Sequence, residues 1–377
     1  MNKKSTFKNS LKLIVPLLLS TALLFNCKQN ESDVVIIDNA DAVEVNFEDA
    51  ATNIRVVPLE SDEPLPPSRN IQCYDNELFL LDNKNLSIYY FKDNKFVSKL
   101  NAVGRGPGEY LALSTFTYSP KEKTLYVIGF SDITYIMKYS VPGMNFIEKV
   151  SFDGNISYLS MFDDNYIFAS MNKKGDSCSV SVIDIHNGKI SKILDLKAYS
   201  YAESDITMSS FSSQNHTFAI SDHINTIGTI NSKLEFTPVI KISFGEKNIP
   251  EKLLEYKLND INGFLELAKY MSEEGESRLT GCYHSIINDR TVSFWYHNPI
   301  NPDDTYYYRY NNGCEAHYKG LKIEGINKPI KPASVTTDGY YISLFEGGSD
   351  TYLNRDEKPS SLAKTIIETI FLSHIYS

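Results

Sequence analysis

Val103–Tyr110, which reads VGRGPGEY, surrounds one arginine with three glycines and a proline. Arginine can bind a carboxylate or phosphate through two parallel hydrogen bonds, so Arg105 is a candidate ligand-binding residue. Glycine permits positive φ and proline fixes φ near about −65°, so the stretch also fits a tight corner in which Arg105 pairs with Glu109. A nucleotide loop is excluded because neither Lys-Ser nor Lys-Thr follows and no helical pattern begins there. The turn residues are Gly104, Gly106, Pro107 and Gly108.

Aromatic residues are the second set that could bind a ligand. The chain has 25 tyrosines and 20 phenylalanines but one tryptophan, and they gather in SFWYHNP (293–299) and DTYYYRYNN (304–312). High β-propensity and packing between sheets explain most such residues. In the alternative interpretation, some of them reach a central channel and stack on a sugar ring or a peptide, with arginines as polar anchors. The candidates for this ligand site are Arg105, Tyr158, Arg278, Tyr283, His284 and Trp295.

Catalytic and metal-binding patterns are weak. The strands predicted to line the channel are RNIQC, LSTFT, ISYLS, ITMSS, GCYHS and KPASV, which contain one histidine, His284, and no carboxylate. A divalent cation needs several convergent oxygen or nitrogen ligands, so we expect no metal site and no cofactor. A lone histidine is more often a structural hydrogen-bonding residue than a catalytic one, and the chain lacks the G-x-S-x-G nucleophile motif. No catalytic residue is assigned, and a hydrolase or lyase acting in the axial pocket is kept as the alternative function.

A repeating pattern of short strands carries these residues. From Glu77 the chain returns, roughly every 40 to 52 residues, to alternating strands separated by turns of Asn, Asp, Gly or Lys. The first copy is NELFLLDNKNLSIYYFKDNKFVSKL, four more full copies follow, and a partial copy starts at DGYYISLFEGGSD. Each such unit can bury its faces only against its neighbours, as propeller blades do around a channel. The pattern predicts an all-β fold, a six-bladed β-propeller.

Residues 249–275 interrupt the strands with a helical pattern. Pro250 suits a first helical turn, and Asn262-Gly263 is expected to divide the segment into two helices. The segment is interpreted as an insertion between the fourth and fifth blades that packs on one end of the propeller or, alternatively, covers the channel as a lid. The apolar residues at helical spacing are Leu253, Leu254, Leu258, Ile261, Leu265 and Ala268.

Three segments give the chain a resemblance to a known family. IRVVPLES (54–61), GRGPGEY (104–110) and IPEKLLEY (249–256) stand in the same order in exported six-bladed β-propeller lipoproteins of Bacteroides-like bacteria, which the chain resembles over residues 43–350. It also looks like a distant relative of NHL-repeat and TolB-type propellers. The resemblance implies a ring closed by Ile54–Leu59 pairing into the last blade.

The C-terminal end departs from that family. Relatives finish with a strand that completes the last blade, whereas this chain ends in SSLAKTIIETIFLSHIYS (360–377). We expect residues 351–377 to be a tail that forms an altered closing strand, a short helix, or the product of a truncated reading frame.

The N-terminus has the pattern of an export signal. Four lysines precede the apolar run Leu13–Phe25, whose thirteen residues fall short of the about 20 that a transmembrane helix needs. Cys27 follows in LLFNC, where a lipoprotein signal peptidase would leave a lipidated cysteine, although Asn26 replaces the usual small residue. An ordinary secretory leader is the alternative. We predict a signal peptide at 1–26, a linker at 27–42 and the propeller at 43–350, with membrane attachment only through lipid.

Net charge and cysteine content limit the classes of partner and of cysteine chemistry that we expect for this chain. Residues 1–26 hold four of the 37 basic and none of the 47 acidic residues, so the remaining chain has a net charge of −14, which disfavours nucleic acid. The other cysteines show no C-x-x-C spacing, so they are interpreted as buried thiols, with one or two disulfides as the alternative. These are Cys73, Cys178, Cys282 and Cys314. The sequence predicts a cell-envelope protein, lipid-anchored to the outer membrane on its periplasmic or surface side, that binds a glycan, a peptide or an envelope protein.

Overall fold

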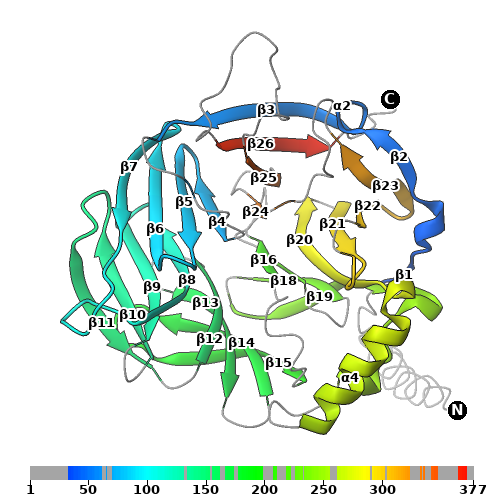
Figure 1. Ribbon diagram of the computed structural model, residues 1–377. Helices are drawn as coiled ribbons and strands as arrows, with labels where there is room; N and C mark the ends of the chain where they lie inside the picture. The colour runs from blue at the N-terminus through cyan, green and yellow to red at the C-terminus, as the bar shows by residue number, and fades with distance from the viewer. Residues whose placement is uncertain are drawn as a thin grey trace, which may run out of the picture.

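The computed structural model describes residues 33–61, 65, 70–130, 134–152, 155–161, 166–173, 177–197, 207–209, 218–221, 226–231, 233–254, 261–288, 291–301, 304–322, 332, 334–335, 341–346 and 364–371. The predicted signal peptide and Cys27 lie outside these residues. Figure 1 shows the strands gathered into sheets that stand around a ring. The predicted β-propeller is therefore confirmed.

The described strands form six sheets, numbered here in chain order. The first sheet contains β4 (Ile71–Tyr74), β5 (Glu77–Asp82), β6 (Ser87–Lys92) and β7 (Lys95–Leu100). The second contains β8 (Ala112–Ser119), β9 (Thr124–Phe130), β10 (Thr134–Ser140) and β11 (Phe146–Ser151). The third contains β12 (Asn155–Met161), β13 (Tyr166–Lys173), β14 (Ser177–Asp184) and β15 (Ile190–Lys197).

The other three sheets each include a strand from the N-terminal part of the chain. The fourth contains β16 (Thr207–Ser209), β17 (Phe218–Ser221), β18 (Thr226–Ile230), β19 (Phe236–Ser243) and β1 (Asp33–Ile36). The fifth contains β20 (Thr280–Asn288), β21 (Thr291–His297), β22 (Thr305–Tyr310), β23 (Cys314–Lys322) and β2 (Val43–Asn46). The sixth contains β24 (Ser334–Val335), β25 (Tyr341–Glu346), β26 (Lys364–Phe371) and β3 (Ala51–Leu59).

Local turn chemistry explains the hairpins within each sheet. Asp82 ends β5, and its carboxylate accepts the backbone N–H groups of Lys84 and Asn85, each at 3.0 Å. Asp184 plays the same part after β14, where it accepts the N–H of His186 at 2.8 Å. Aspartate favours such turns because its short side chain replaces a backbone acceptor. The Asn and Asp turns that the sequence shows are thus where the strands reverse.

The strands predicted to line the channel are the innermost ones. β4, β8, β12, β16, β20 and β24 each stand at one end of their sheet's strand order, and several of them contact the first strand of the next sheet. Figure 1 shows β4, β16, β20 and β24 close to the centre of the ring.

Hydrophobic residues fill the spaces between neighbouring sheets. Phe79 of β5 and Phe116 of β8 are fully buried with ring centroids 6.2 Å apart, which joins the first sheet to the second. Ile227 of β18 and Phe294 of β21 belong to a buried cluster that joins the fourth to the fifth. Because each face is covered by the next sheet, the core is spread around the ring rather than gathered in one centre.

The N-terminal segment is a strap that runs along the outside of three sheets. We call residues 33–59 the N-terminal strap; it contains β1, the 3-10 helix η1 (Asn39–Asp41), β2, α2 (Phe47–Ala50) and β3. β1 pairs in parallel with β19, and β2 pairs in parallel with β23. Figure 1 shows the strap in blue along the rim. Part of the predicted linker, 27–42, is therefore built into the sheets.

The sixth sheet brings the two ends of the chain together. β3 is antiparallel to β26, with Leu59 opposite Lys364 and Ile54 opposite Thr369. The predicted pairing of Ile54–Leu59 into the last sheet is confirmed. β26 lies beyond residue 350, where the sequence placed the end of the propeller, and it takes the form of the altered closing strand.

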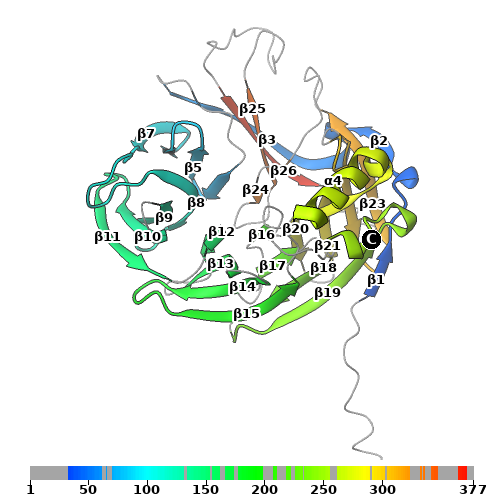
Figure 2. The same ribbon diagram turned by 60° about the horizontal axis from the view of Figure 1, so that its bottom comes forward.

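The helical segment lies between β19 and β20 in the chain. It contains η3 (Gly245–Lys247), α3 (Glu251–Leu254), α4 (Ile261–Glu274) and η4 (Gly275–Ser277). Both views show α4 beside the fourth and fifth sheets (Figures 1 and 2). Among the helices of the described residues, none has the length and apolarity to cross a membrane.

Two details of the helical prediction are wrong. Asn262-Gly263 does not divide the helices, because both residues lie in the first turn of α4, where backbone N–H groups have no intrahelical partner and glycine costs little. Leu265 is 56% exposed, so it does not belong to the buried face. The residues of α4 that pack against Ile249 and Leu253 are instead Leu267, Tyr270 and Met271.

Candidate functional site

The loop that carries Arg105 is a closed corner between β7 and β8. The carboxylate of Glu109 folds back into the loop and accepts the backbone N–H of Gly106 at 2.6 Å. A Cβ on Gly104 would overlap this carboxylate, which explains the glycine there. Arg105 itself is exposed, and among the described residues no ion pair joins it to Glu109. The corner interpretation fits this geometry, although the partner of Glu109 is a backbone amide rather than Arg105.

Two buried tyrosines and one glycine with positive φ hold the same corner. Tyr110 donates from its hydroxyl to the carbonyl of Leu86 at 2.9 Å, and Tyr139 donates to the carbonyl of Gly108 at 2.8 Å. Gly108 has φ +76°, and a Cβ there would overlap the ring of Phe146. The loop is therefore packed against the second sheet, while the side chain of Arg105 remains exposed.

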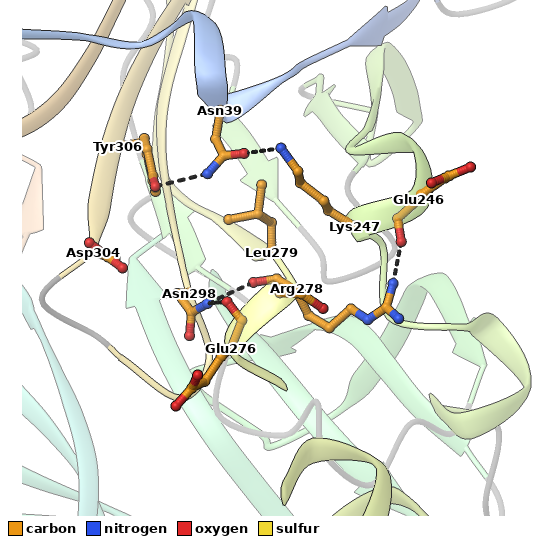
Figure 3. A pocket seen from close by; sticks show the side chains of 10 residues that line it. Asn39, Glu246, Lys247, Glu276, Arg278, Leu279, Asn298, Asp304 and Tyr306 are labelled. Atoms are coloured by element: carbon orange, nitrogen blue, oxygen red, sulfur yellow. Dashed lines mark hydrogen bonds between the residues drawn. The ribbon is translucent and has the colours of Figure 1, made fainter. Parts of the chain in front are cut away.

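A pocket of about 470 Å³ lies at the equivalent connection between the fourth and fifth sheets. Its walls come from η1 of the strap, from η3, from the end of η4 and from the corner between β21 and β22. Figure 3 shows the side chains that surround it. The lining residues are Asn39, Glu246, Lys247, Glu276, Ser277, Arg278, Leu279, Asn298, Asp304 and Tyr306.

Arg278 is the predicted site residue that belongs to this pocket. Its side chain is 19% exposed, and its Nη1 donates to the backbone carbonyl of Glu246. Nη2 lies 3.4 Å from the carboxylate of Glu274, and the guanidinium stands 5.3 Å from the ring centroid of Tyr270. These contacts fix the guanidinium and use one donor on Nη1 and one on Nη2 of its five N–H donors.

Lys247 connects the pocket to the N-terminal strap. Its amino group donates to Asp38 Oδ1 at 2.7 Å and to Asn39 Oδ1. Asn39 in turn donates to the hydroxyl of Tyr306 at 2.9 Å. The hydrogen bond from Lys247 holds the pKa of Asp38 below its ordinary value. Residues more than 200 positions apart in the sequence thus meet in one wall, as Figure 3 shows for Asn39, Lys247 and Tyr306.

Asn298 connects the two segments that form one wall of the pocket, the end of η4 and the corner between β21 and β22. Its side-chain amide is within reach of three backbone carbonyls, those of Gly275 at 3.3 Å, Glu276 at 2.8 Å and Arg278 at 3.1 Å. Its Oδ1 accepts the N–H groups of Ile300 and Asn301, each at 2.8 Å. This one buried side chain therefore locks η4 and the β21–β22 corner together before any ligand arrives.

The basic and the acidic side chains that line the pocket lie on different sides of it. In Figure 3, Lys247 and Arg278 lie on one side, Asp304 on the opposite side and Glu276 below. Leu279, which is buried, lies between them. An acidic group can bind against Arg278, while hydroxyl or amide donors can bind Asp304 and Glu276.

The other predicted binding residues do not join Arg278. Trp295 on β21 is 1% exposed, and its ring meets Tyr307 and Tyr341 edge-on at 5.4 and 5.9 Å between centroids. Its predicted stacking on a ligand is wrong, because neighbouring strands cover the indole. Tyr158 lies in β12 and Tyr283 in β20, both innermost strands, but their side chains fall outside the described part.

His284 on β20 has the character of a structural histidine. Its backbone φ is +51°, and its ring donates to the backbone carbonyl of Pro332. Burial lowers the pKa of His284 to about 4, since the charged ring loses hydration, while the Pro332 bond acts in the opposite direction. In the part of the chain that the structure describes, no group of three His, Cys, Asp or Glu residues is placed to hold a metal ion.

Sequence reasoning missed most of the pocket. Asn39 stood in the predicted linker, and Lys247 and Asp304 stood in loops with no recognised motif. Asn298 had a usable signal, since Asn-Pro after a strand marks a turn, but the carbonyls it binds come from a separate segment. The aromatic run did place Tyr306 on a strand, although without its hydrogen bond to Asn39.

Solved structures share this fold at low sequence identity. A protein of Bacteroides fragilis, named as an exported protein, matches with a TM-score of 0.65 and 15% identity over 90% of this chain and 100% of its own. A member of the DUF4221 family from Bacteroides vulgatus matches with a TM-score of 0.53 and 12% identity over 85% of this chain and 97% of its own. No curated protein matches in sequence.

The match to a family profile extends over nearly all of the described chain. It runs from residue 32 to residue 369, and so includes the N-terminal strap, the pocket and most of β26. The chain belongs to the family described as the domain of unknown function DUF4934.

Proposed function

We propose that this protein is an exported, lipid-anchored β-propeller that serves as a binding or scaffold module in the cell envelope. The leader and Cys27 support export and lipidation, and a protein of the same fold from Bacteroides fragilis is named as exported. In this proposal the six sheets are six blades of one ring, and the α3–α4 segment is an insertion between the fourth and fifth blades. The net charge of −14 without the leader disfavours nucleic acid as a partner.

The pocket beside the strap is the proposed ligand site. The observation that carries this proposal is the position of Arg278, whose guanidinium is fixed by Glu246, Glu274 and Tyr270 at the wall of a pocket of about 470 Å³. The ligand chemistry that fits is a carboxylate for Arg278, flanked by hydrogen-bond donors for Asp304 and Glu276. An acidic glycan and an acidic peptide both have this chemistry.

Glycan and peptide arrays probed with soluble protein that begins after Cys27 would distinguish the two sources. For the best hit, Arg278→Gln should lower the affinity about tenfold or more, because a charge-assisted hydrogen bond contributes about 1.5 to 3 kcal/mol. Isothermal titration calorimetry measures this change.

Arg309→Gln is the matched control. Arg309 is buried to a similar extent, at 16% exposure, and pairs with Glu315 at 2.9 Å outside the pocket. Its substitution should leave the affinity unchanged. An Arg278→Gln protein that folds and binds as tightly as the parent would contradict this site.

A further inference from the structure

The first strand of the strap leaves an unusual edge on the fourth sheet. β1 is the outermost strand there, and among the described strands only β19 pairs with it. Side chains alternate along β1 and into Ile37, the residue after it: Val35 and Ile37 are buried at 6% and 2% exposure, whereas Val34 and Ile36 are 63% and 76% exposed. Val34 and Ile36 are the two most exposed large hydrophobic residues of the described chain.

Such an edge needs an explanation, because exposed edge strands of soluble proteins usually carry charges that prevent association. The charged residues nearest to Val34 along this edge are Asp33, which begins β1, and Lys241, which stands opposite Val34 in the parallel register and is exposed. Asp38, the first acidic residue after β1, is already paired with Lys247. The edge thus combines two exposed aliphatic side chains with the exposed amino group of Lys241, in a chain that is otherwise strongly acidic.

The length of chain before β1 identifies what this edge meets. Cys27 precedes Asp33 by six residues. A fully extended chain spans at most about 3.3 to 3.6 Å per residue, so β1 starts within about 20 Å of a lipid attached to Cys27. This distance is smaller than the width of a propeller disc, so the rim at the fourth sheet must be close to the bilayer.

We propose that β1 rests on the phospholipid bilayer, with Val34 and Ile36 in its interface, so that the disc stands on the membrane by the rim of its fourth sheet. This inference rests on the lipid anchor of the proposed function. Lys241 then lies at headgroup level, where its amino group meets lipid phosphates while its methylene chain covers apolar surface. The first sheet, with β4 to β7, lies across the ring from β1 in Figure 1 and faces away from the membrane.

The lipid anchor makes this weak contact sufficient. Two aliphatic side chains do not hold a protein on a membrane by themselves, but a short tether keeps them at a high effective concentration next to it. The contact should therefore require acylated Cys27, and unlipidated protein should stay in solution.

Photo-crosslinking on vesicles tests the orientation. Full-length lipidated protein with a photoreactive benzoylphenylalanine in place of Val34 is reconstituted in phosphatidylethanolamine and phosphatidylglycerol vesicles, illuminated and examined for lipid adducts by mass spectrometry. The control carries the same residue at Ile147, which is 51% exposed on the outer strand β11 of the second sheet. We expect several-fold more lipid adduct at position 34 than at position 147, and none at either position in Cys27→Ser protein.

The possible results separate the two proposals. Equal adduct at both positions, or none at position 34, with an acyl group confirmed on Cys27, would overturn the orientation and leave the anchor intact. Crosslinks from position 34 to a second copy of the chain would also overturn it. If Cys27 carries no acyl group, the anchor itself fails and the orientation fails with it.

Discussion

The corner that follows the first sheet and the segment that follows the fourth sheet make the same connection in two ways. Both lead from an outer strand of one sheet to the inner strand of the next, from β7 to β8 and from β19 to β20. The first does so in a short loop whose glycines admit the Glu109 carboxylate and the Phe146 ring. The second uses two helices and two 3-10 turns, and a pocket lies between them and the strap. A tight loop buries its polar groups within itself, whereas a longer connection leaves space between its elements.

The two connections also treat their arginines differently. Arg105 is exposed, and the loop beneath it is satisfied without its side chain. Arg278 is mostly buried and is held from three directions. An arginine that is positioned in advance loses less conformational entropy when it binds a ligand, so Arg278 is the better anchor.

Substitution of the glycine with positive φ in each connection should give the largest difference in the free energy of unfolding. Gly108→Ala should destabilise the protein by about 3 kcal/mol or more, because it combines positive φ with an overlap on Phe146. Gly245→Ala, at φ +58° with no atom within 4 Å of the added Cβ, should cost only about 1 to 2 kcal/mol. Denaturant unfolding measures both, and equal losses would show that the first corner is not tightly packed.

Asn298→Ala should have the next largest effect and should act on the second connection alone. Loss of its amide leaves three backbone carbonyls of the 275–278 segment without their shared donor, at a cost of about 1 to 3 kcal/mol. Hydrogen exchange should rise in η4 and at the β21–β22 corner but not at 103–110. Asn187→Ala, in an exposed hairpin turn, is the matched control and should change exchange only locally. Unchanged exchange in η4 would contradict the framing role of Asn298.

Acid should weaken the fifth sheet, which contains His317 on β23, and the first sheet, which contains Glu77 on β5, in different pH ranges. Burial lowers the pKa of His317, while Asp41 and Asp38 oppose the shift. The contribution of His317 to the free energy of unfolding is therefore complete above its unfolded-state pKa, near 6.5. This contribution is lost as the pH falls from that value toward the lower pKa of the folded state. Burial would raise the pKa of Glu77, but hydrogen bonds from Tyr90, Lys123 and Tyr118 lower it overall, so its contribution is lost only below about pH 4.5.

The free energy of unfolding, measured against pH for the parent and for each single variant, isolates the contribution of each group. The difference between parent and His317→Gln should begin to change as the pH falls below about 6.5, and the difference between parent and Glu77→Gln only below about pH 4.5. Because His284 also has a lowered pKa, the difference from the parent is the meaningful quantity. Coincident pH ranges for the two variants would contradict these assignments.

Arg105→Ala should give the smallest effect. Exposed side chains without a partner usually change stability by less than about 0.5 kcal/mol, so the melting temperature should stay nearly constant. Differential scanning calorimetry provides the measurement. A loss of several degrees would show that the Arg105 side chain stabilises the corner after all.

The fold was largely predictable, because its signals are local. Alternation along β5 and β6, and turns such as the one at Asp82, depend on neighbours a few residues apart. The innermost strands followed from the same repeat. The segment with the helical pattern contains α3 and α4, but Leu265, one of its apolar residues at helical spacing, is exposed, because exposure depends on where α4 meets the neighbouring sheets.

The candidate site was less predictable, because its members are remote in sequence. Arg278 was identified as a polar anchor, but it was grouped with Trp295, which neighbouring strands bury, and with Arg105, which lies at another corner. The hydrogen bond between Asn39 and Tyr306 joins residues 267 positions apart. No local pattern encodes such a contact.

The sequence by itself determined the strands, their turns and the propeller that they build, since alternation and turn residues act between near neighbours in the chain. Only the tertiary structure decided that the strap adds parallel strands to two sheets, that β26 pairs with β3, and that Asn39, Lys247, Arg278 and Asn298 surround one pocket. The physical reason is closure of the ring, which brings distant segments side by side and so selects partners that local preferences cannot specify.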